Sequence, residues 1–110
     1  MDLNHVTLTG TLELDPITRF QDTGTPQVRF TLRVDEPGPA GQRFKLFVPV
    51  EAYGPAGAQA GELIAGAVVL VAGKLKWTSY TDKHGQKRTS LCVLARLVKR
   101  LAPAAVAAAV

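Results

Sequence analysis

The chain has 110 residues, which suits one domain that buries a core without disulfide or metal support. Its 13 lysines and arginines against 9 aspartates and glutamates give a formal charge of +4, which mildly favours polyanionic partners. The single cysteine, Cys92, excludes an intramolecular disulfide and a cysteine-based metal site, and we expect it to be a buried small hydrophobe. The N-terminus lacks the pattern of a signal peptide and no apolar run could span a bilayer, so we expect a cytoplasmic protein without a membrane partner.

Two strand segments are predicted at the start of the chain. Apolar and polar residues alternate from Val6 to Leu14, which predicts a long strand. Gly10 interrupts it, and a glycine in a strand marks a bulge or a sharp bend of the kind that closes small barrels. Residues 17–20 form a short second piece, and turn-forming residues follow over 21–26.

A hairpin is predicted next, with strands over 27–34 and 44–53 and a loop over 35–42. Pro49 cannot donate to a strand ladder, so it indicates a bulge or a locally unpaired edge. Because successive strand residues point to opposite faces, the apolar even positions should all face the core. These positions are Val28, Phe30, Leu32, Val34, Phe44, Leu46, Val48 and Val50.

The other face of this hairpin mixes cations with aromatic rings, at Arg29, Arg33, Lys45, Phe47 and Tyr53. Positive charge attracts backbone phosphates and flat rings stack on unpaired bases, so single-stranded nucleic acid is the predicted ligand. An oligomer interface also favours exposed aromatics, and the arginines could be ordinary solvated residues. The strand pattern alone leaves these alternatives open.

The second half of the chain predicts a short helix over 61–66, a strand over 67–80, a hairpin tip over 82–86 and a last strand over 91–101. Gly85 supplies the positive φ that the tip needs. Trp77 shares the apolar parity, which favours core or subunit contact over base stacking. Residues 102–110 are expected to form a flexible tail. The strand over 67–80 and the hairpin after it carry further candidate contacts to nucleic acid, five cations and an aromatic ring. These residues are Lys74, Lys76, Tyr80, Lys83, Lys87 and Arg88.

Five strands with a helix between the third and fourth predict an all-β protein, an OB-fold Greek-key barrel over residues 1–101. SH3-like barrels are the rival, but they have shorter strands and lack the helix. The sequence contains no carboxylate pair, glycine-rich phosphate loop or metal-spaced cluster. We therefore expect a binding protein without a cofactor and not an enzyme.

Several segments between residues 3 and 101 share the pattern of a known family. The most specific is Asn4-His5-Val6-Thr7-Leu8-Thr9-Gly10-Thr11-Leu12 followed by Asp15-Pro16-Ile17-Thr18-Arg19-Phe20. Further segments are Thr23-Gly24-Thr25-Pro26-Gln27-Val28-Arg29-Phe30-Thr31-Leu32, Ala52-Tyr53-Gly54, Gly73-Lys74-Leu75, Tyr80-Thr81-Asp82 and Gly85-Gln86. Together they resemble the bacterial single-stranded DNA-binding proteins.

This resemblance implies base-stacking roles for Phe47, Tyr53 and Tyr80, which stand where the family places such aromatics. It implies an OB-fold that assembles into homodimers and often homotetramers. It also implies binding of single-stranded DNA without sequence preference, in DNA replication, repair or recombination.

The sequence departs from the family's pattern at three places. The loop over 35–42 is shorter and lacks a nearby tryptophan, and Phe47 and Tyr80 replace tryptophans with smaller rings. The sequence ends in an uncharged alanine and valine tail where the family has a linker and an acidic tip. Weaker DNA wrapping is therefore expected, and recruitment of replication and repair enzymes through such a tip is in doubt.

Two other interpretations stay open. Val48-Pro49-Val50 resembles the third strand of primosomal replication protein N, a short OB dimer, so the chain could be a primosomal accessory protein or a stand-alone paralogue. It could instead be a structural OB module that binds protein through its aromatic face and does not bind DNA.

Overall fold

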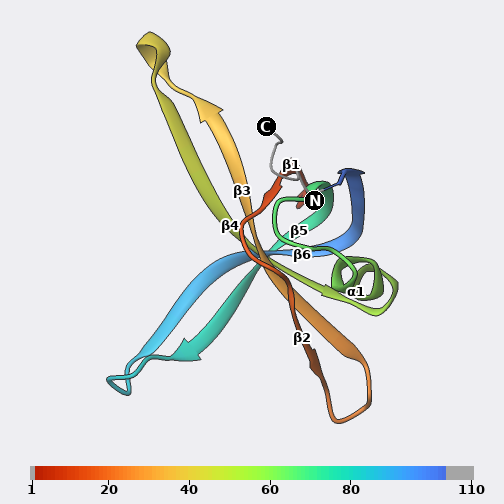
Figure 1. The fold of residues 1–110 in the computed structure, drawn as a ribbon. Coiled ribbons are helices and arrows are strands. Elements are labelled where there is room, and N and C mark those ends of the chain that lie inside the picture. The colour runs from red at the N-terminus through yellow and green to blue at the C-terminus, as the bar shows by residue number, and fades with distance from the viewer. Residues whose placement is uncertain (1, 104–110) are drawn as a thin grey trace.

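The structure is a computed structural model that describes residues 2 to 103. These residues form six strands, a 3-10 turn and one helix, and Figure 1 labels the strands and the helix. In chain order they are β1 (Val6–Leu12), β2 (Ile17–Phe20), β3 (Pro26–Pro37), η1 (Pro39–Gly41), β4 (Arg43–Tyr53), α1 (Gly54–Gly61), β5 (Val68–Thr81) and β6 (Lys87–Ala102). The predicted tail lies outside the described residues except for Ala102, which ends β6, and the residue after it. Over the described range, no helix has the length and apolar character needed to cross a membrane.

Five of the strands close into a barrel. The sheet order is β1-β5-β6-β4-β3-β2, and a further pairing of β1 with β3 completes the ring. β4 and β6 run parallel, and the other strand pairs are antiparallel. β2 pairs only with β3 and extends beside the ring, while α1 lies between the third and fourth strands of the barrel along the chain. The predicted five-stranded OB-fold with its intervening helix is confirmed.

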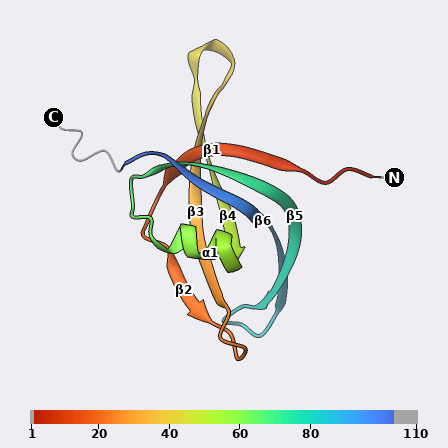
Figure 2. The same cartoon turned by 90° about the vertical axis from the view of Figure 1, so that its right-hand side faces the viewer.

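The core fills the inside of this ring and continues under α1. Each contributing strand supplies alternate residues, as expected for a barrel whose outer face meets solvent. In Figure 2, α1 lies in front of β3 and β4, and it packs against β3, β4 and β6. The buried side chains are Leu12, Val28, Phe30, Leu32, Val34, Val50, Ala52, Ala56, Ala60, Ala67, Val69, Val71, Val93, Ala95 and Val98.

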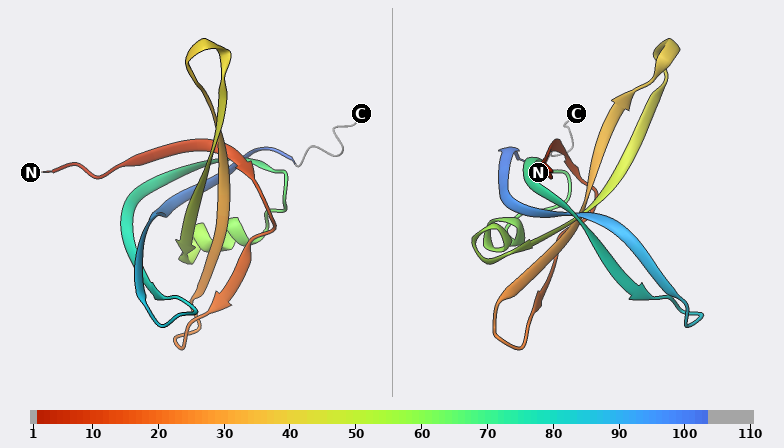
Figure 3. Two further views of the ribbon diagram at one scale, coloured as in Figure 1. Left: turned by 90° about the vertical axis from the view of Figure 1, so that its left-hand side faces the viewer. Right: turned by 180° about the vertical axis from the view of Figure 1, so that it is seen from behind.

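Three hairpins leave the barrel in different directions, as Figures 1 and 3 show. One is formed by β2 and β3. The second, which we call the β3–β4 arm, comprises residues 34–48, and the third, the β5–β6 arm, comprises residues 74–92. Within the arms each strand pairs only with its hairpin partner, because β4 meets β6 from Val50 to Ala52 only.

The arms explain why part of the predicted core is exposed. Phe30 is buried as predicted, but Phe44 and Leu46 in the β3–β4 arm are 51% and 47% exposed. Trp77 in the β5–β6 arm is 67% exposed, so it does not belong to the core of this chain. Alternation identified the correct face of each strand, but within residues 2–103 no strand or helix covers that face once the hairpin has left the barrel.

Strand lengths also differ from the predictions. β3 continues to Pro37, three residues into the predicted loop over 35–42, and β4 begins at Arg43, so residues 38–42 separate the two strands. β6 begins at Lys87 and not at Leu91. The two strands of an arm form backbone hydrogen bonds whether or not their side chains are apolar. The apolar pattern therefore underestimated the length of the strands in both hairpins. β1 ends at Leu12, two residues before the predicted end. Pro49 lies just outside the β4–β6 pairing, which confirms the predicted unpaired edge.

The helix was predicted too late in the chain. It spans Gly54–Gly61, with Pro55 in its first turn, where a missing N–H costs nothing. Its inward face is made of small residues, including Ala56 and Ala60, which are buried against the barrel. Beyond Gly61 the predicted helix is absent: residues 62–66 form turns and irregular structure, and the Ala65 N–H donates to Asp15 Oδ1 at 2.7 Å.

Glycines act at close contacts and at a hairpin turn. Of the bulge or sharp bend predicted at Gly10, the bulge is absent, because β1 pairs with β5 without interruption through this residue. Gly10 instead makes room for the Arg33 backbone where β1 passes from β5 to β3. A register shift does occur between Ala72 and Gly73. Gly85 has φ +77° at the β5–β6 tip, as predicted.

Replacing Gly73 with alanine is expected to destabilise the fold by about 1–3 kcal/mol, because the added methyl group overlaps the Leu94 carbonyl oxygen of the paired strand. Urea unfolding followed by circular dichroism measures the change. Gly61→Ala is the matched control, since its methyl group would meet Thr18 Oγ1 at an ordinary 3.6 Å. That variant should be at least as stable as the parent chain, and equal stability of the two variants would contradict the close approach at Gly73.

Candidate nucleic-acid interface

The outward face of the β3–β4 hairpin carries the predicted cations and rings. Strand register pairs Arg33 with Phe47, Arg29 with Glu51 and Gln27 with Tyr53. All the odd positions of the two strands therefore share one face, as the sequence pattern predicted. Lys45 continues the same face into the β3–β4 arm.

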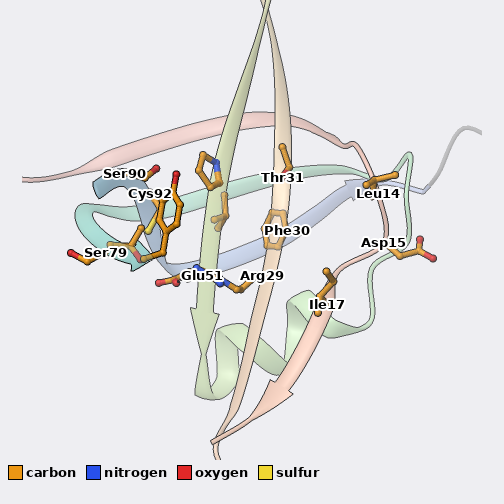
Figure 4. A pocket seen from close by; sticks show the side chains of 14 residues that line it. Leu14, Asp15, Ile17, Arg29, Phe30, Thr31, Glu51, Ser79, Ser90 and Cys92 are labelled. Atoms are coloured by element: carbon orange, nitrogen blue, oxygen red, sulfur yellow. Dashed lines mark ion pairs between the residues drawn. The ribbon is translucent and has the colours of Figure 1, made fainter. Parts of the chain in front are cut away.

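A groove of about 590 Å³ crosses this face. Its walls come from the β1–β2 connection on one side and from the β5–β6 arm on the other, with β3 and β4 between them, as Figure 4 shows. Tyr80 and Thr78 line the arm side of the groove. The labelled residues in the figure are Leu14, Asp15, Ile17, Arg29, Phe30, Thr31, Glu51, Ser79, Ser90 and Cys92.

The three predicted stacking rings differ in exposure and position. Phe47 is 55% exposed on the outward face of the β3–β4 arm, and Tyr80 is 51% exposed beside the groove. Tyr53 is half-buried at the end of β4, directly before α1. Phe47 and Tyr80 thus stand on the two arms, and Tyr53 lies close to the barrel.

A buried carboxylate lies in the middle of this cationic face. Glu51 is 4% exposed and forms two ion pairs: its Oε1 lies 3.0 Å from Arg29 Nη2, and its Oε2 lies 2.7 Å from Lys76 Nζ. Burial by itself raises the pKa of Glu51, but Lys76 and Arg29 outweigh burial and hold that pKa below its usual value. The same contact with Glu51 raises the pKa of Lys76. The carboxylate therefore neutralises part of the charge that the strand pattern indicated.

Tyr53 belongs to the same network. Gln27 Nε2 donates to the Tyr53 hydroxyl at 3.0 Å and lies 3.3 Å from Glu51 Oε1. Lys76 Nζ lies 5.9 Å from the centroid of the Tyr53 ring, within the range of a cation–π contact. Tertiary structure thus brings together Arg29, Tyr53 and Lys76, three of the predicted site residues.

Two further predicted cations are also paired. Arg33 lies 3.7 Å from Glu13 Oε2 and 3.5 Å from Asp35 Oδ1. Arg88 Nε donates to Asp82 Oδ2 at 2.9 Å, and this hydrogen bond lowers the pKa of Asp82. Among the described residues, four predicted cations have no ion pair: Lys45, Lys74, Lys83 and Lys87.

The β5–β6 arm distributes its predicted residues over both of its faces. Register places Arg88 opposite Tyr80, so these two side chains share the face that lines the groove. Lys87 is paired with Thr81 one position away and therefore projects from the opposite face, which also carries Trp77. Lys83 lies at the exposed tip.

Cys92 lines the groove from its position opposite Lys76, but it is only 2% exposed. Burial raises the pKa of its thiol, so the group is a weakly reactive part of the floor, as the sequence predicted. Within residues 2–103, no cluster of three His, Cys, Asp or Glu side chains could hold a metal ion.

Sequence reasoning missed Glu51 and Gln27. Both stand on the same odd parity as Arg29 and Tyr53, so an acid in that series was visible as an exception to the cationic pattern. Its burial was not visible, because Lys76 reaches it from β5, a strand far along the chain.

Comparison with known proteins identifies the family of this chain. Residues 3–101 match the model of the single-strand binding protein family. The chain is 34% identical over 98 residues to the single-stranded DNA-binding protein of Thermus thermophilus, a match that covers 89% of this chain and 37% of the relative. The Thermus aquaticus protein of the same name is 34% identical over 99 residues, with 89% and 38% covered. The chain thus spans well under half the length of these two relatives.

A third relative is nearer in length. Single-stranded DNA-binding protein 2 of Clostridium acetobutylicum is 33% identical over 102 residues, which cover 90% of this chain and 77% of that protein. The match of the family model from residue 3 to residue 101 includes all six strands and the helix almost completely. The chain therefore belongs to the single-strand binding protein family.

Proposed function

We propose that this protein binds single-stranded DNA without sequence preference and acts on it in DNA replication, repair or recombination. The observation that carries the proposal is the pair of half-exposed rings, Phe47 and Tyr80, that stand beside cations on the two arms of one face. Rings stack on any base and cations contact the backbone, so neither feature selects a sequence. The names of the relatives, single-stranded DNA-binding proteins, support the same ligand, and such a protein would work in the cytoplasm, with the cell's DNA.

Titration of the protein with oligo-dT at several salt concentrations tests this proposal. We expect micromolar or tighter binding at low salt, with a slope of log K against log salt near −2 if Lys45, Lys74 and Lys83 contact phosphates, at about 0.7 per contact, because Lys87 projects from the opposite face of the arm. A slope near −5 would mean that the four paired cations also leave their carboxylates and contact phosphates. If no binding occurs at low salt, the proposal is wrong and the protein-binding module becomes the better interpretation.

Alanine substitution of the rings tests the surface. Phe47→Ala and Tyr80→Ala should each weaken binding to oligo-dT of about eight nucleotides, by about 1–3 kcal/mol per lost stacking contact. Fluorescence anisotropy measures the dissociation constants. The oligonucleotide is short so that one protomer suffices to bind it.

Trp77→Ala is the matched control for Tyr80→Ala. Trp77 is a larger and more exposed ring only three residues away, but it projects from the opposite face of the arm. Its removal should leave binding of the short oligonucleotide unchanged. A loss as large as that of Tyr80→Ala would show that the DNA follows a different face of the arm.

We also propose that the protein assembles into a homodimer or homotetramer. Leu75, Trp77 and Leu91 form an apolar surface on the β5–β6 arm, and they are 43%, 67% and 46% exposed in the single chain. Exposed apolar groups of this kind mark interaction surfaces, and burial between copies would remove them from water.

Light scattering after size exclusion should therefore give two or four times the chain mass of 11.7 kDa. Trp77→Asp should lower the measured mass, because a charge in an apolar interface lacks a partner. Lys83→Asp, at the exposed tip, serves as the control for a new acidic charge. A monomeric parent chain would contradict the assembly but not the binding of DNA.

A further inference from the structure

Glu51 is an unusual group for a surface that is proposed to meet phosphates. A carboxylate on such a surface repels the ligand if it is exposed and is costly if it is buried without partners. Glu51 is buried and ion-paired, with one oxygen 3.0 Å from Arg29 Nη2 on β3 and the other 2.7 Å from Lys76 Nζ on β5. The side chain thus ties together three strands at the floor of the groove.

Two branches of this network end on Tyr53. Through Gln27, which approaches both the Glu51 carboxylate and the Tyr53 hydroxyl, the network holds the edge of the ring. Through Lys76, whose ammonium group is 5.9 Å from the ring centroid, it holds one face. Each branch contains a flexible side chain, Gln27 or Lys76. Without the Glu51 carboxylate, these side chains would be free to adopt other rotamers.

We infer that Glu51 is a positioning residue for DNA binding, which orients the Tyr53 ring for stacking through Lys76 and Gln27. The inference rests on the proposed function, and it gives Arg29 and Lys76 a role other than contact with phosphates. Both pair with Glu51, which neutralises much of their charge. A ring that is already ordered loses less conformational freedom when a base stacks on it.

The geometry separates this role from general stabilisation. Buried ion pairs add little net stability compared with apolar residues of similar size, because desolvation offsets their attraction. The ionic arrangement adds direction, since each oxygen lies against a cation from a different strand and Gln27 donates to the Tyr53 hydroxyl. The expected consequence is coupling between Glu51 and Tyr53 that does not extend to Tyr80.

A double-mutant cycle with Glu51→Gln and Tyr53→Ala tests the coupling. Tyr53→Ala should weaken oligo-dT binding by a factor that is at least about threefold smaller in the Glu51→Gln background than in the parent chain. Tyr80→Ala, outside the network, should cost the same factor in both backgrounds. Equal losses for Tyr53→Ala in both backgrounds would overturn the inference and leave the proposed function intact.

The salt dependence gives a second readout from the same titrations. Glu51→Gln frees Arg29 and Lys76 to contact phosphates, so the slope of log K against log salt should steepen by up to about 1.4. Asp82→Asn, which frees only Arg88 and does not touch Tyr53, is the matched control for loss of a paired carboxylate. It should steepen the slope by about half as much and leave the effect of Tyr53→Ala unchanged. An unchanged slope in Glu51→Gln would contradict the assignment of Arg29 and Lys76 as internal partners.

A measurement on the free protein separates this inference from the proposed function. Carbon-13 relaxation of the Tyr53 ring should show greater mobility in Glu51→Gln than in the parent chain, with no DNA present. If Glu51→Gln fails to fold, Gln27→Ala removes one branch of the network at a partly exposed position and should loosen the same ring. An equally rigid Tyr53 ring in the folded variant would refute the positioning role, whether or not the protein binds DNA.

Discussion

Two short strand contacts close the ring of five strands. β4 meets β6 over Val50 to Ala52, and β1 meets β3 at Thr11 and Leu12. Strands in a closed barrel are tilted and staggered, so each long strand belongs to the ring over only part of its length. The remainder continues as a two-stranded arm. The position of the core, the exposed rings and the walls of the groove all depend on where each strand leaves the ring.

Apolar residues on the same face of a hairpin are buried inside the barrel and exposed in the arms. Leu32 and Leu46 share a face of the same hairpin, but Leu32 lies inside the barrel and is buried, while Leu46 lies in the β3–β4 arm and is half-exposed. On the opposite face, the same departure from the barrel raises Phe47 away from the ring, and the β5–β6 arm does so for Tyr80. The face that meets a nucleic acid in our proposal is therefore a product of barrel closure.

Electrostatics on this face depends on pairing more than on the number of cations. Half of the eight predicted cations lie beside carboxylates, and two of them share Glu51, which lines the groove. A buried carboxylate is stable there because both cations approach it and keep its pKa low. The unpaired lysines lie mainly on the arms, where charge reaches solvent and can attract a polyanion from a distance.

Much of the fold was accessible from the sequence because alternation and turn chemistry are local properties. They were sufficient for the five-stranded barrel, for the core positions Val28 and Phe30, for the unpaired edge at Pro49 and for the positive φ of Gly85. The helix was misplaced because its buried face consists of alanine and glycine, which carry a weak hydrophobic signal.

Some features of the candidate site were also accessible from the sequence, and others were not. The amino-acid sequence by itself determined which residues share a strand face, since successive side chains of any strand point to opposite sides. Only the tertiary structure decided that Trp77 is exposed and that Lys76 is bound to Glu51. Exposure depends on which strands cover a face, and ion pairing depends on which strands are neighbours. Both are set by closure of the barrel, which joins residues that are far apart in the chain.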